Sequence, residues 1–327
     1  MASTVAEALQ ELRLNPRFAA QITAWQCLPA RSGRFAPLPE GLEPQLQEAL
    51  RRLGIQSFYT HQSQAIAAAL HGEDVAVVTG AASGKTLCYN IPVLNTLLRD
   101  PQARALYLFP TKALAQDQLA AWQNLSQDLL PSEAAATYDG DTPSPVRARI
   151  REGTRVLITN PDMLHVGILP HHTRWAAFFA GLKYVVIDEM HAYRGVFGSH
   201  VANLLRRLRR ICHFYGAHPT FICCSATIAN PQELATQLVG RQVVLVDEDG
   251  SPRGERHVIL YNPPLLDQAQ GMRRNLLLEA ATVADFFLSK ELPTIIFSQG
   301  RLSTELLLTY LRQAAEKHGQ PLSRIRG

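Results

Sequence analysis

The sequence of 327 residues has few cysteines, and their arrangement excludes the usual structural roles of that residue. Their number is odd, no two are spaced as CxxC, and two are adjacent, so neither a disulfide framework nor a zinc site is expected. We therefore predict free thiols, no zinc in this chain and a cytoplasmic protein. The cysteines are Cys27, Cys88, Cys212, Cys223 and Cys224.

Long apolar runs are also missing. No uninterrupted run approaches the roughly 20 residues that a membrane-spanning helix requires. The N-terminus lacks the basic start and apolar block of a secretory signal, and no internal repeat or low-complexity tract stands out. We expect no membrane partner.

Excess charge is small. The chain has 32 Lys and Arg against 28 Asp and Glu, which leaves a net charge of +4. This balance tolerates a polyanionic partner but does not predict one. With 46% hydrophobic and 18% charged residues, the chain can form a packed core. Its length suggests about two domains.

Six short apolar runs alternate with longer amphipathic stretches. Continuous runs of valine, isoleucine, leucine and phenylalanine predict strands buried on both faces, and the stretches between them are long enough for crossover helices. The pattern predicts an α/β fold with a parallel sheet flanked by helices. The expected strands are Val75–Val78, Ala105–Phe109, Val156–Thr159, Tyr184–Asp188, Phe221–Ser225 and Val243–Val246.

A charged segment with glycine and proline, DEDGSPRGE, interrupts this rhythm and predicts a linker. After it we expect strands at His257–Tyr261 and Thr294–Ser298. Helices are expected around Arg273–Leu288 and from Arg301. Two such units rarely form a stable domain, so the second domain is expected to be incomplete, the alternative being an appendage of the first. The predicted parts are an N-terminal helical extension (1–55), a first domain (56–247), a linker (248–256) and an incomplete second domain (257–327).

A small-residue turn follows the first of the strands and precedes an apolar helix. Its exposed N–H groups and the helix N-terminus form a cradle for phosphate. Lys85 is expected to reach the β and γ phosphates of ATP, and the Thr86 hydroxyl to reach Mg²⁺. The residues expected to bind the nucleotide here are Thr79, Gly80, Ala81, Ala82, Ser83, Gly84, Lys85 and Thr86.

Two carboxylates end the strand Lys-Tyr-Val-Val-Ile, where parallel sheets bind ligands. Asp188 is expected to hold Mg²⁺, and Glu189 to orient or deprotonate the attacking water. His191 is either a switch residue or a partly buried hydrogen-bonding histidine. With Lys85, these three residues are the predicted catalytic group.

Hydroxyl residues end a further strand, FICCSAT. Ser225, Ala226 and Thr227 are expected to couple His191 or the carboxylates to moving elements. The alternative is a cap for the helix that follows. Arg194, close behind the acidic pair, is assigned to the same coupling role.

This set of motifs resembles the superfamily-2 DEAD/DEAH-box helicases, in family order over roughly Phe58–Thr227. Phe58–Gln62 is similar to the Q motif, in which the Gln62 amide would pair with adenine. Pro110–Gln118, Thr159–Met163 and Thr294–Arg301 are similar to motifs Ia, Ib and IV. The resemblance implies a RecA-like P-loop domain and the start of a second one.

A translocating helicase grips the nucleic-acid backbone, because it is indifferent to base sequence. The motif-like turns therefore predict phosphate contacts, with helix capping as the alternative for each. The expected partner is single-stranded DNA, and RNA is not excluded because these motifs do not read the sugar. The predicted contacts are Pro110, Thr111, Lys112, Gly140, Asp141, Thr159, Asn160 and Pro161.

Four arginines form a basic run in the sequence LLRRLRR. On a helix they lie opposite an apolar face, which predicts a solvated outer helix rather than a DNA contact. The residues are Arg206, Arg207, Arg209 and Arg210.

One long segment narrows the resemblance. HAYRGVFGSHVANLLRRLRRICHFYG, followed by ATIANPQELA and YNPP, is similar to MrfA-like helicases, bacterial DNA-repair proteins related to fungal RecQ-like helicases with a C-terminal zinc domain. This implies ATP-driven movement on single-stranded DNA with ATP and Mg²⁺ as cofactors, and it implies that the chain corresponds to the N-terminal part. Motifs V and VI do not occur here, so we expect weak nucleotide turnover by these residues alone. An RNA helicase or an ATP-gated binding module without motor activity remains an alternative.

Overall fold

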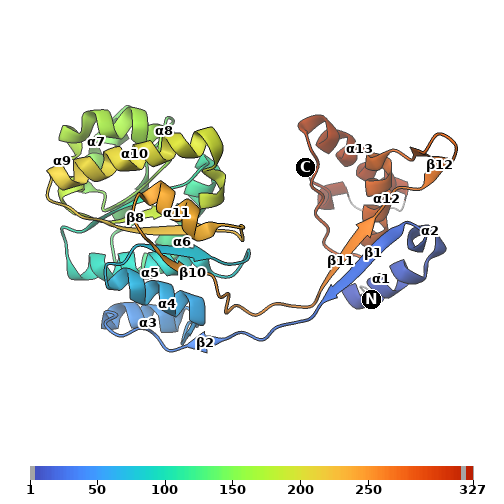
Figure 1. Cartoon of the computed structure of the whole chain (residues 1–327), viewed down its shortest axis with the longest axis horizontal. Helices are drawn as coiled ribbons and strands as arrows, with labels where there is room; N and C mark the ends of the chain where they lie inside the picture. Colours follow the sequence, from blue (N-terminus) through green and yellow to red (C-terminus); the bar gives the residue numbers. More distant parts are fainter. Residues whose placement is uncertain (1–3, 318–321, 327) are drawn as a thin grey trace. The chain divides into compact units, whose positions relative to one another are not determined.

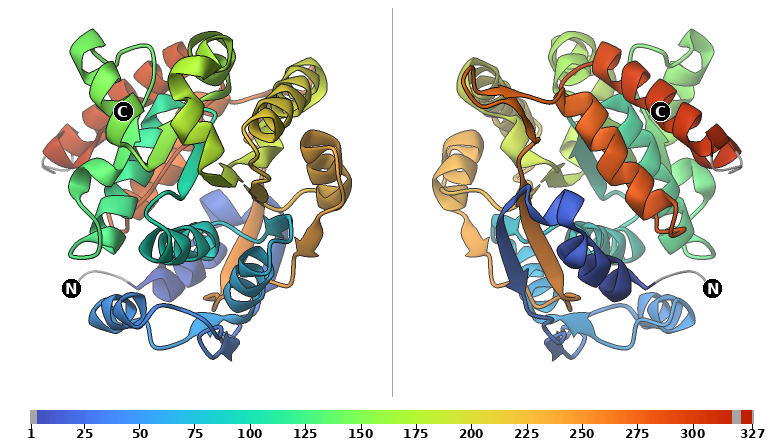
Figure 2. Two further views of the ribbon diagram at one scale, coloured as in Figure 1. Left: turned by 90° about the vertical axis from the view of Figure 1, so that its left-hand side faces the viewer. Right: turned by 90° about the vertical axis from the view of Figure 1, so that its right-hand side faces the viewer.

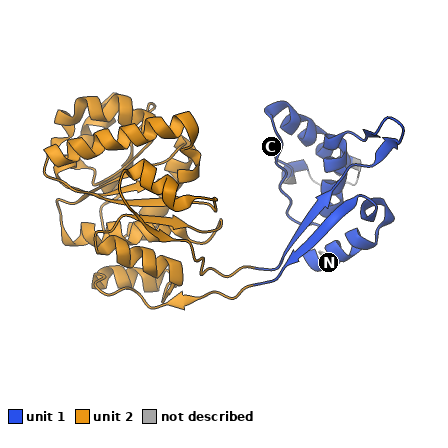
Figure 3. Ribbon diagram, in the orientation of Figure 1, with its two compact units in different colours: residues 1–30, 254–327 blue, residues 31–253 orange. Residues whose placement is uncertain are grey.

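The structure, a computed structural model, describes residues 4–317 and 322–326. The chain forms two compact units (Figure 3). The larger unit comprises residues 31–253, and the smaller one combines residues 1–30 with residues 254–327. The two units are described separately.

The larger unit is built on a seven-stranded parallel sheet (Figure 1). It confirms the predicted α/β class and the six predicted strands. The edge strand Ala135–Thr137 was not predicted, because three small or polar residues give no apolar run. In spatial order the strands are β10 (Val244–Val246), β4 (Val75–Val78), β9 (Thr220–Ser225), β8 (Leu182–Ile187), β5 (Arg104–Leu108), β7 (Val156–Thr159) and β6 (Ala135–Thr137).

Helices cover both faces of this sheet (Figure 2). Successive strand residues point to opposite faces, so Val77 and Tyr107 enter one core while Ala76 and Leu106 enter the other. The first face is covered by α3 (Pro44–Arg52), α4 (Thr60–Leu70), α5 (Lys85–Arg99) and α6 (Lys112–Ser126). The second is covered by α7 (Ser144–Gly153), α9 (Ala176–Ala180), α10 (Gly195–Phe214) and α11 (Pro231–Val239).

Shorter elements connect these layers. They are β2 (Phe35–Ala36), β3 (Phe58–Tyr59), η1 (Ser132–Ala134), α8 (Pro161–Met163), the π-helix η2 (Leu164–Ile168), η3 (Leu169–Trp175) and η4 (Met190–Ala192).

Parallel pairing brings the carboxyl ends of the strands to one edge of the sheet. Val78 of β4 lies opposite Ser225 of β9, and Ile187 of β8 lies opposite Cys223. The loops that follow β4, β9, β8, β5 and β7 therefore succeed one another along this edge. We call it the carboxyl edge.

The smaller unit contains β1 (Ile22–Leu28), which pairs antiparallel with β11 (Arg256–Tyr261). Its small core contains Ala284 of one helix and Leu311 of another. The remaining elements are α1 (Val5–Leu14), α2 (Pro16–Ala19), β12 (Leu265–Asp267), β13 (Met272–Arg273), α12 (Leu276–Leu288), α13 (Arg301–Lys317) and η5 (Leu322–Arg324).

This division differs from the boundaries expected from sequence. The first 55 residues are not purely helical, since they contain β1, and residues 1–30 group with residues 254–327. The strand expected at Thr294–Ser298 is wrong: this segment is assigned to no strand. Ile295 and Phe297 are 77% and 86% exposed, so this apolar run is not buried as the prediction of a core strand requires.

Candidate functional site

The loop between β4 and α5 is closed by side-chain hydroxyls. The Thr79 and Ser83 hydroxyl oxygens lie 2.6 Å apart, and Ser83 donates to the Gly80 carbonyl over 2.8 Å. Ala82 and Gly84 have φ of 58° and 76°, the left-handed conformation that turns the chain into the helix. Thr79 therefore contributes a hydroxyl where the usual phosphate loop has glycine.

Lys85 is the first residue of α5 and folds back over the loop. Its ammonium donates to the carbonyls of Thr79, over 3.1 Å, and Gly80, over 2.8 Å. Thr86 follows it half-buried, and Ala81 is exposed at the rim. A cation at the centre of a loop that begins a helix is the arrangement that binds phosphate.

Gln62 of α4 braces this loop. Its Oε1 accepts from the Tyr59 N–H over 3.0 Å, and its Nε2 donates to the Gly84 carbonyl over 2.9 Å. A side chain on Gly84 would collide with that Nε2. One amide proton of Gln62 is left for a nucleotide base, so its role as an adenine reader stays a prediction.

His61, which the motif analysis gave no role, links the phosphate loop to a distant segment. Its Nδ1 accepts from the Gly250 N–H over 3.1 Å, so the proton is on Nε2, which donates to the Ser83 carbonyl over 3.1 Å. Burial lowers the pKa of His61, which favours this neutral form. The partner of His61 at Gly250 lies 189 residues away in the chain, so the sequence gives no sign of this contact.

The segment Asp249–Arg253 packs beside the loop, although the sequence placed it in a linker. Ser251 donates to Asp249 through its hydroxyl over 2.6 Å and its N–H over 2.9 Å. Arg253 forms an ion pair with the same carboxylate. A Cβ on Gly80 would lie 2.5 Å from the Arg253 guanidinium, so this arginine contacts the phosphate loop.

Asp188 follows β8 at the carboxyl edge and is 9% exposed. Burial raises its pKa, while hydrogen bonds from the Glu189 N–H and the Tyr89 hydroxyl and the charge of Lys85 oppose that rise. The two hydrogen bonds measure 2.8 and 2.9 Å. The Lys85 ammonium and the Asp188 carboxylate thus act electrostatically on one another across the strand between them.

Tyr89 is a second site residue that the motifs did not reveal. It lies on α5 one turn after Lys85, and its hydroxyl is 2.9 Å from both Asp188 Oδ2 and Gln118 Oε1. Burial raises its pKa, so it remains a neutral donor. The spacing of four residues on a helix places Lys85 and Tyr89 on one face, and that spacing was the available signal.

His191 connects the acidic strand end to the neighbouring strand. Its Nδ1 lies 3.3 Å from Glu189 Oε2 and 3.4 Å from the buried Ser225 hydroxyl. Among the residues assigned to coupling, Ser225 makes this contact, whereas Thr227 is exposed and Ala226 is half-buried.

Arg194 is the residue before α10 and its side chain is exposed. Its described contacts are made by its backbone: its N–H donates to Ala192, and its carbonyl accepts from Gly198. The structure therefore shows no link from Arg194 to the carboxylates among the described contacts, and its coupling role stays a prediction.

The two motif-like turns at the far end of the carboxyl edge cap helices. Thr111 accepts from the Leu114 N–H over 3.3 Å, and Asn160 accepts from the Met163 N–H over 2.8 Å. Thr159 is buried and donates to the Tyr138 carbonyl over 2.5 Å. Its hydroxyl is therefore turned inward, and a phosphate contact by Thr159 stays a prediction.

The remaining predicted contacts surround these turns. Lys112 and Asp141 form an exposed ion pair of 2.6 Å, beside a hollow of about 380 Å³. Pro110 precedes the first turn half-exposed, Gly140 is exposed, and Pro161 is buried at the start of α8. The predicted nucleic-acid residues thus lie close together along β5, β7 and β6.

One further grouping bears on the prediction of no zinc. In the described chain, ligand atoms of Cys27, Glu255 and His257 lie within 4.8 Å of one another. His257 already uses both ring nitrogens, with Trp25 at 3.0 Å and Glu255 at 2.8 Å. Absence of zinc stays a prediction.

The parallel sheet, the cation-centred loop and the acidic end of a nearby strand define a RecA-like P-loop domain. The family description DEAD/DEAH box helicase matches residues 59–234, more than half of the chain. The chain belongs to this family.

Individual relatives agree with the narrower resemblance. The chain is 45% identical to the ATP-dependent helicase YprA of Bacillus subtilis (strain 168) over 314 residues, which is 96% of this chain and 41% of YprA. It is 39% identical to the ATP-dependent helicase HRQ1 of Saccharomyces cerevisiae over 315 residues, 95% of this chain and 29% of that protein. The chain therefore spans about two-fifths or less of these relatives.

Solved structures agree as well. A crystal structure of the DUF1998 helicase MrfA bound to DNA and AMPPNP superposes with a TM-score of 0.91 at 45% identity, covering 96% of this chain and 43% of that one. The helicase Mss116 bound to single-stranded RNA and UDP-BeF has a TM-score of 0.53 at 18% identity over 65% of this chain and 46% of that one, which shows the fold alone. The MrfA-like resemblance is confirmed.

Proposed function

We propose that this chain is the ATP-binding and DNA-gripping part of an ATP-dependent DNA helicase that moves on single-stranded DNA in DNA repair. One observation carries the proposal: the phosphate loop, the acidic strand end and the two capped turns occupy one edge of a single parallel sheet. Nucleotide hydrolysis and the binding of a DNA strand can be linked there through neighbouring β-strands of the sheet.

Within this proposal, Lys85 leaves its loop carbonyls to bind phosphate. The hydroxyl of Thr86 and the carboxylate of Asp188 are the hard oxygen ligands that Mg²⁺ prefers. Asp188 accepts two hydrogen bonds but offers about four lone-pair positions, so it retains capacity toward a metal hydration shell. Bound Mg²⁺ would supply charge neutralisation at the phosphates.

Glu189 is the proposed base for the attacking water, and His191 holds it toward Ser225. Ser225 ends β9, the strand between the phosphate loop and Glu189. A movement of Glu189 on nucleotide hydrolysis would therefore be transmitted to β9 through His191.

DNA is preferred to RNA because MrfA, a 45% identical structure, is bound to DNA. Residues 1–327 would be titrated against labelled single-stranded DNA and RNA of one sequence, with and without AMPPNP. We expect AMPPNP to change the affinity for DNA, and Lys85→Ala to abolish that change while leaving nucleotide-free binding intact. Stronger nucleotide-linked binding to RNA would favour an RNA helicase, and absence of binding to either would reject the proposal.

A cytoplasmic location is also proposed. All five cysteines are free thiols, as expected in a reducing compartment. Across residues 4–317 and 322–326, no helix combines the length and apolarity required to cross a bilayer.

A further inference from the structure

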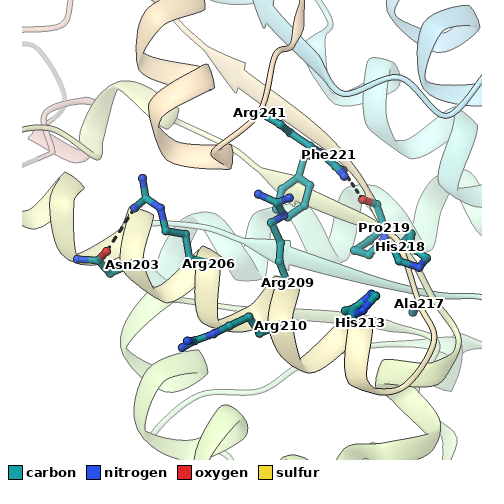
Figure 4. Close-up of a pocket in the computed structure, with 10 residues that line it drawn as sticks. All are labelled: Asn203, Arg206, Arg209, Arg210, His213, Ala217, His218, Pro219, Phe221 and Arg241. Atoms are coloured by element: carbon teal, nitrogen blue, oxygen red, sulfur yellow. Dashed lines mark hydrogen bonds between the residues drawn. The ribbon is translucent and has the colours of Figure 1, made fainter.

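A basic hollow lies between α10, the start of β9 and the residues that precede β10 (Figure 4). It has a volume of about 700 Å³. Pro219 precedes the amino end of β9, so the hollow is at the edge of the sheet opposite the phosphate loop. Its lining consists of Asn203, Arg206, Arg209, Arg210, His213, Ala217, His218, Pro219, Phe221 and Arg241.

The positive charges here are mostly uncompensated. Arg206 contacts the neutral Asn203 side chain at 3.3 Å, and Arg209 donates to the carbonyl of Val239 over 3.1 Å. Of the arginines that line the hollow, Arg241 is the one with an ion pair among the described contacts, to the buried Asp74 carboxylate. Among the described residues that line the hollow, none carries a carboxylate.

Four guanidinium groups against one carboxylate leave about three positive charges in one concave surface. Like charges placed together repel one another and disfavour the folded state. Such a cluster is explained when an anion binds it, because concave surfaces of one sign concentrate the opposite charge. The sequence predicted a solvated outer helix, and it could not show that Arg241 would join the arginines of α10.

The shape favours an extended anion over a single ion. The basic side chains from Arg206 to His213 follow α10 over seven residues, or about 10 Å at 1.5 Å per residue. One strand of a duplex advances about 3.4 Å per phosphate and an extended single strand advances further, so this row is long enough for about two or three phosphates. Arg241 faces the row from across the hollow, with its guanidinium carbon 5.4 Å from the centre of the Phe221 ring.

We propose that this hollow is a second nucleic-acid contact. It binds the phosphodiester backbone of the DNA at a place distant from the carboxyl edge. The inference rests on the proposed function, because it extends the path of the same DNA. The six-residue strand β9, which begins beside the hollow, separates the two edges by about 20 Å. A short oligonucleotide therefore occupies one contact, and a longer one engages both.

The test is the salt dependence of DNA binding by residues 1–327. Arg206→Gln/Arg210→Gln removes two exposed charges without stranding a buried carboxylate, as Arg241 substitutions would. Arg207→Gln is the matched control, since it lies on the same helix outside the lining. Fluorescence anisotropy with labelled single-stranded DNA of about 40 nucleotides gives the slope of log K against log salt, which falls by roughly 0.7 per lost phosphate contact.

We expect the double variant to flatten the slope by about 1.4 and Arg207→Gln to keep the wild-type slope. An unchanged slope in the double variant, with AMPPNP-dependent DNA binding preserved, overturns this inference and leaves the proposed function standing. Loss of all DNA binding in the wild type overturns both.

A calorimetric titration with tripolyphosphate distinguishes the source of phosphate. If tripolyphosphate binds the wild type and not the double variant, while the DNA slopes are equal, the hollow takes a free polyphosphate and the backbone assignment is wrong. Weaker tripolyphosphate binding together with a flatter DNA slope supports the assignment.

Discussion

The contacts that Lys85 and Asp188 make in the folded chain compete with the contacts they are proposed to make with a nucleotide and its metal. The lysine is held by two backbone carbonyls of its own loop, and the aspartate is a nearly buried acid whose ionised form burial disfavours. Each side chain has a local partner that a nucleotide or its metal would replace. Single substitutions at these two residues therefore test nucleotide affinity and the free energy of unfolding in separate measurements.

Replacing Lys85 by alanine removes a charged donor to phosphate. A hydrogen bond to a charged group contributes about 1.5–3 kcal/mol, so we expect Lys85→Ala to weaken ATP-analogue affinity by at least about tenfold. Lys183→Ala, an exposed lysine on β8, is the control with unchanged affinity. Titration of a fluorescent ATP analogue into both variants measures these affinities. Equal affinities would show that Lys85 is not part of the nucleotide site.

Asp188 gives a prediction with a defined sign. Its pKa in the folded chain is raised above the ordinary 3.8, so the folded state binds the proton more tightly than the unfolded state does. Folding stability is therefore lost as pH rises from 3.8 through the folded pKa. We expect Asp188→Asn to unfold at higher urea than the wild type at pH 7, with the difference closing as pH falls toward 3.8. A less stable variant at pH 7 would contradict this reasoning.

At the scale of elements, the segment Asp249–Arg253 holds the two points at which the chain enters and leaves the larger unit, at residues 31 and 253. Arg31 and Arg253 exchange two backbone hydrogen bonds of 2.8 Å, and Asp249 contacts both guanidinium groups. His61 then joins Gly250 to the phosphate loop. These contacts link the phosphate loop to Arg31 and Arg253, the two residues at which the chain enters and leaves the larger unit.

Asp249 gives the opposite pH dependence to that of Asp188. Burial alone would raise its pKa, but hydrogen bonds from Ser251 and the Arg253 ion pair outweigh burial and lower it. Its contribution to stability is therefore present above about 3.8 and fades as pH falls below that value. We expect Asp249→Asn to be less stable than the wild type at pH 6, with the difference shrinking in acid.

Glu248→Gln is the neighbouring control for that measurement. Its carboxylate is 80% exposed and pairs with Arg34 at 3.4 Å, and exposed pairs contribute about 0–1 kcal/mol. Denaturant unfolding between about pH 2 and about pH 6, a range that brackets the ordinary aspartate pKa, compares the two variants. Equal acid profiles for both would show that Asp249 is not the responsible group.

Much of the larger unit follows from the sequence because its strands are buried on both faces. Continuous apolar runs such as Val75–Val78 have few alternative structures once helices can cover them. β1 was missed because ITAWQCL mixes polar and apolar residues without a continuous apolar run, and five of its seven residues are exposed in the structure. The motif residues located the carboxyl edge. The contacts of His61 with Gly250 and of Tyr89 with Asp188 join residues 189 and 99 positions apart, and a single sequence does not display such pairs.

At the scale of the whole molecule, the chain covers 41% of YprA and 43% of the MrfA chain. We propose that residues 1–327 bind nucleotide but hydrolyse it slowly, since the arginines expected in motifs V and VI do not occur among them. An arginine that stabilises the transferred phosphoryl group contributes about 10³–10⁵ in rate. A coupled assay with saturating single-stranded DNA measures this, and DNA-stimulated turnover of roughly several per second, within the usual enzyme range, would refute the expectation.

The pairing of β1 with β11 has a consequence for biosynthesis. Trp25 and His257, joined by a hydrogen bond across this ribbon, are 232 residues apart. A ribosome adding about 5–20 residues per second needs on the order of ten to fifty seconds to supply the second strand. Until the second strand is made, the first one lacks this partner, so its backbone edge stays open to pairing with other chains.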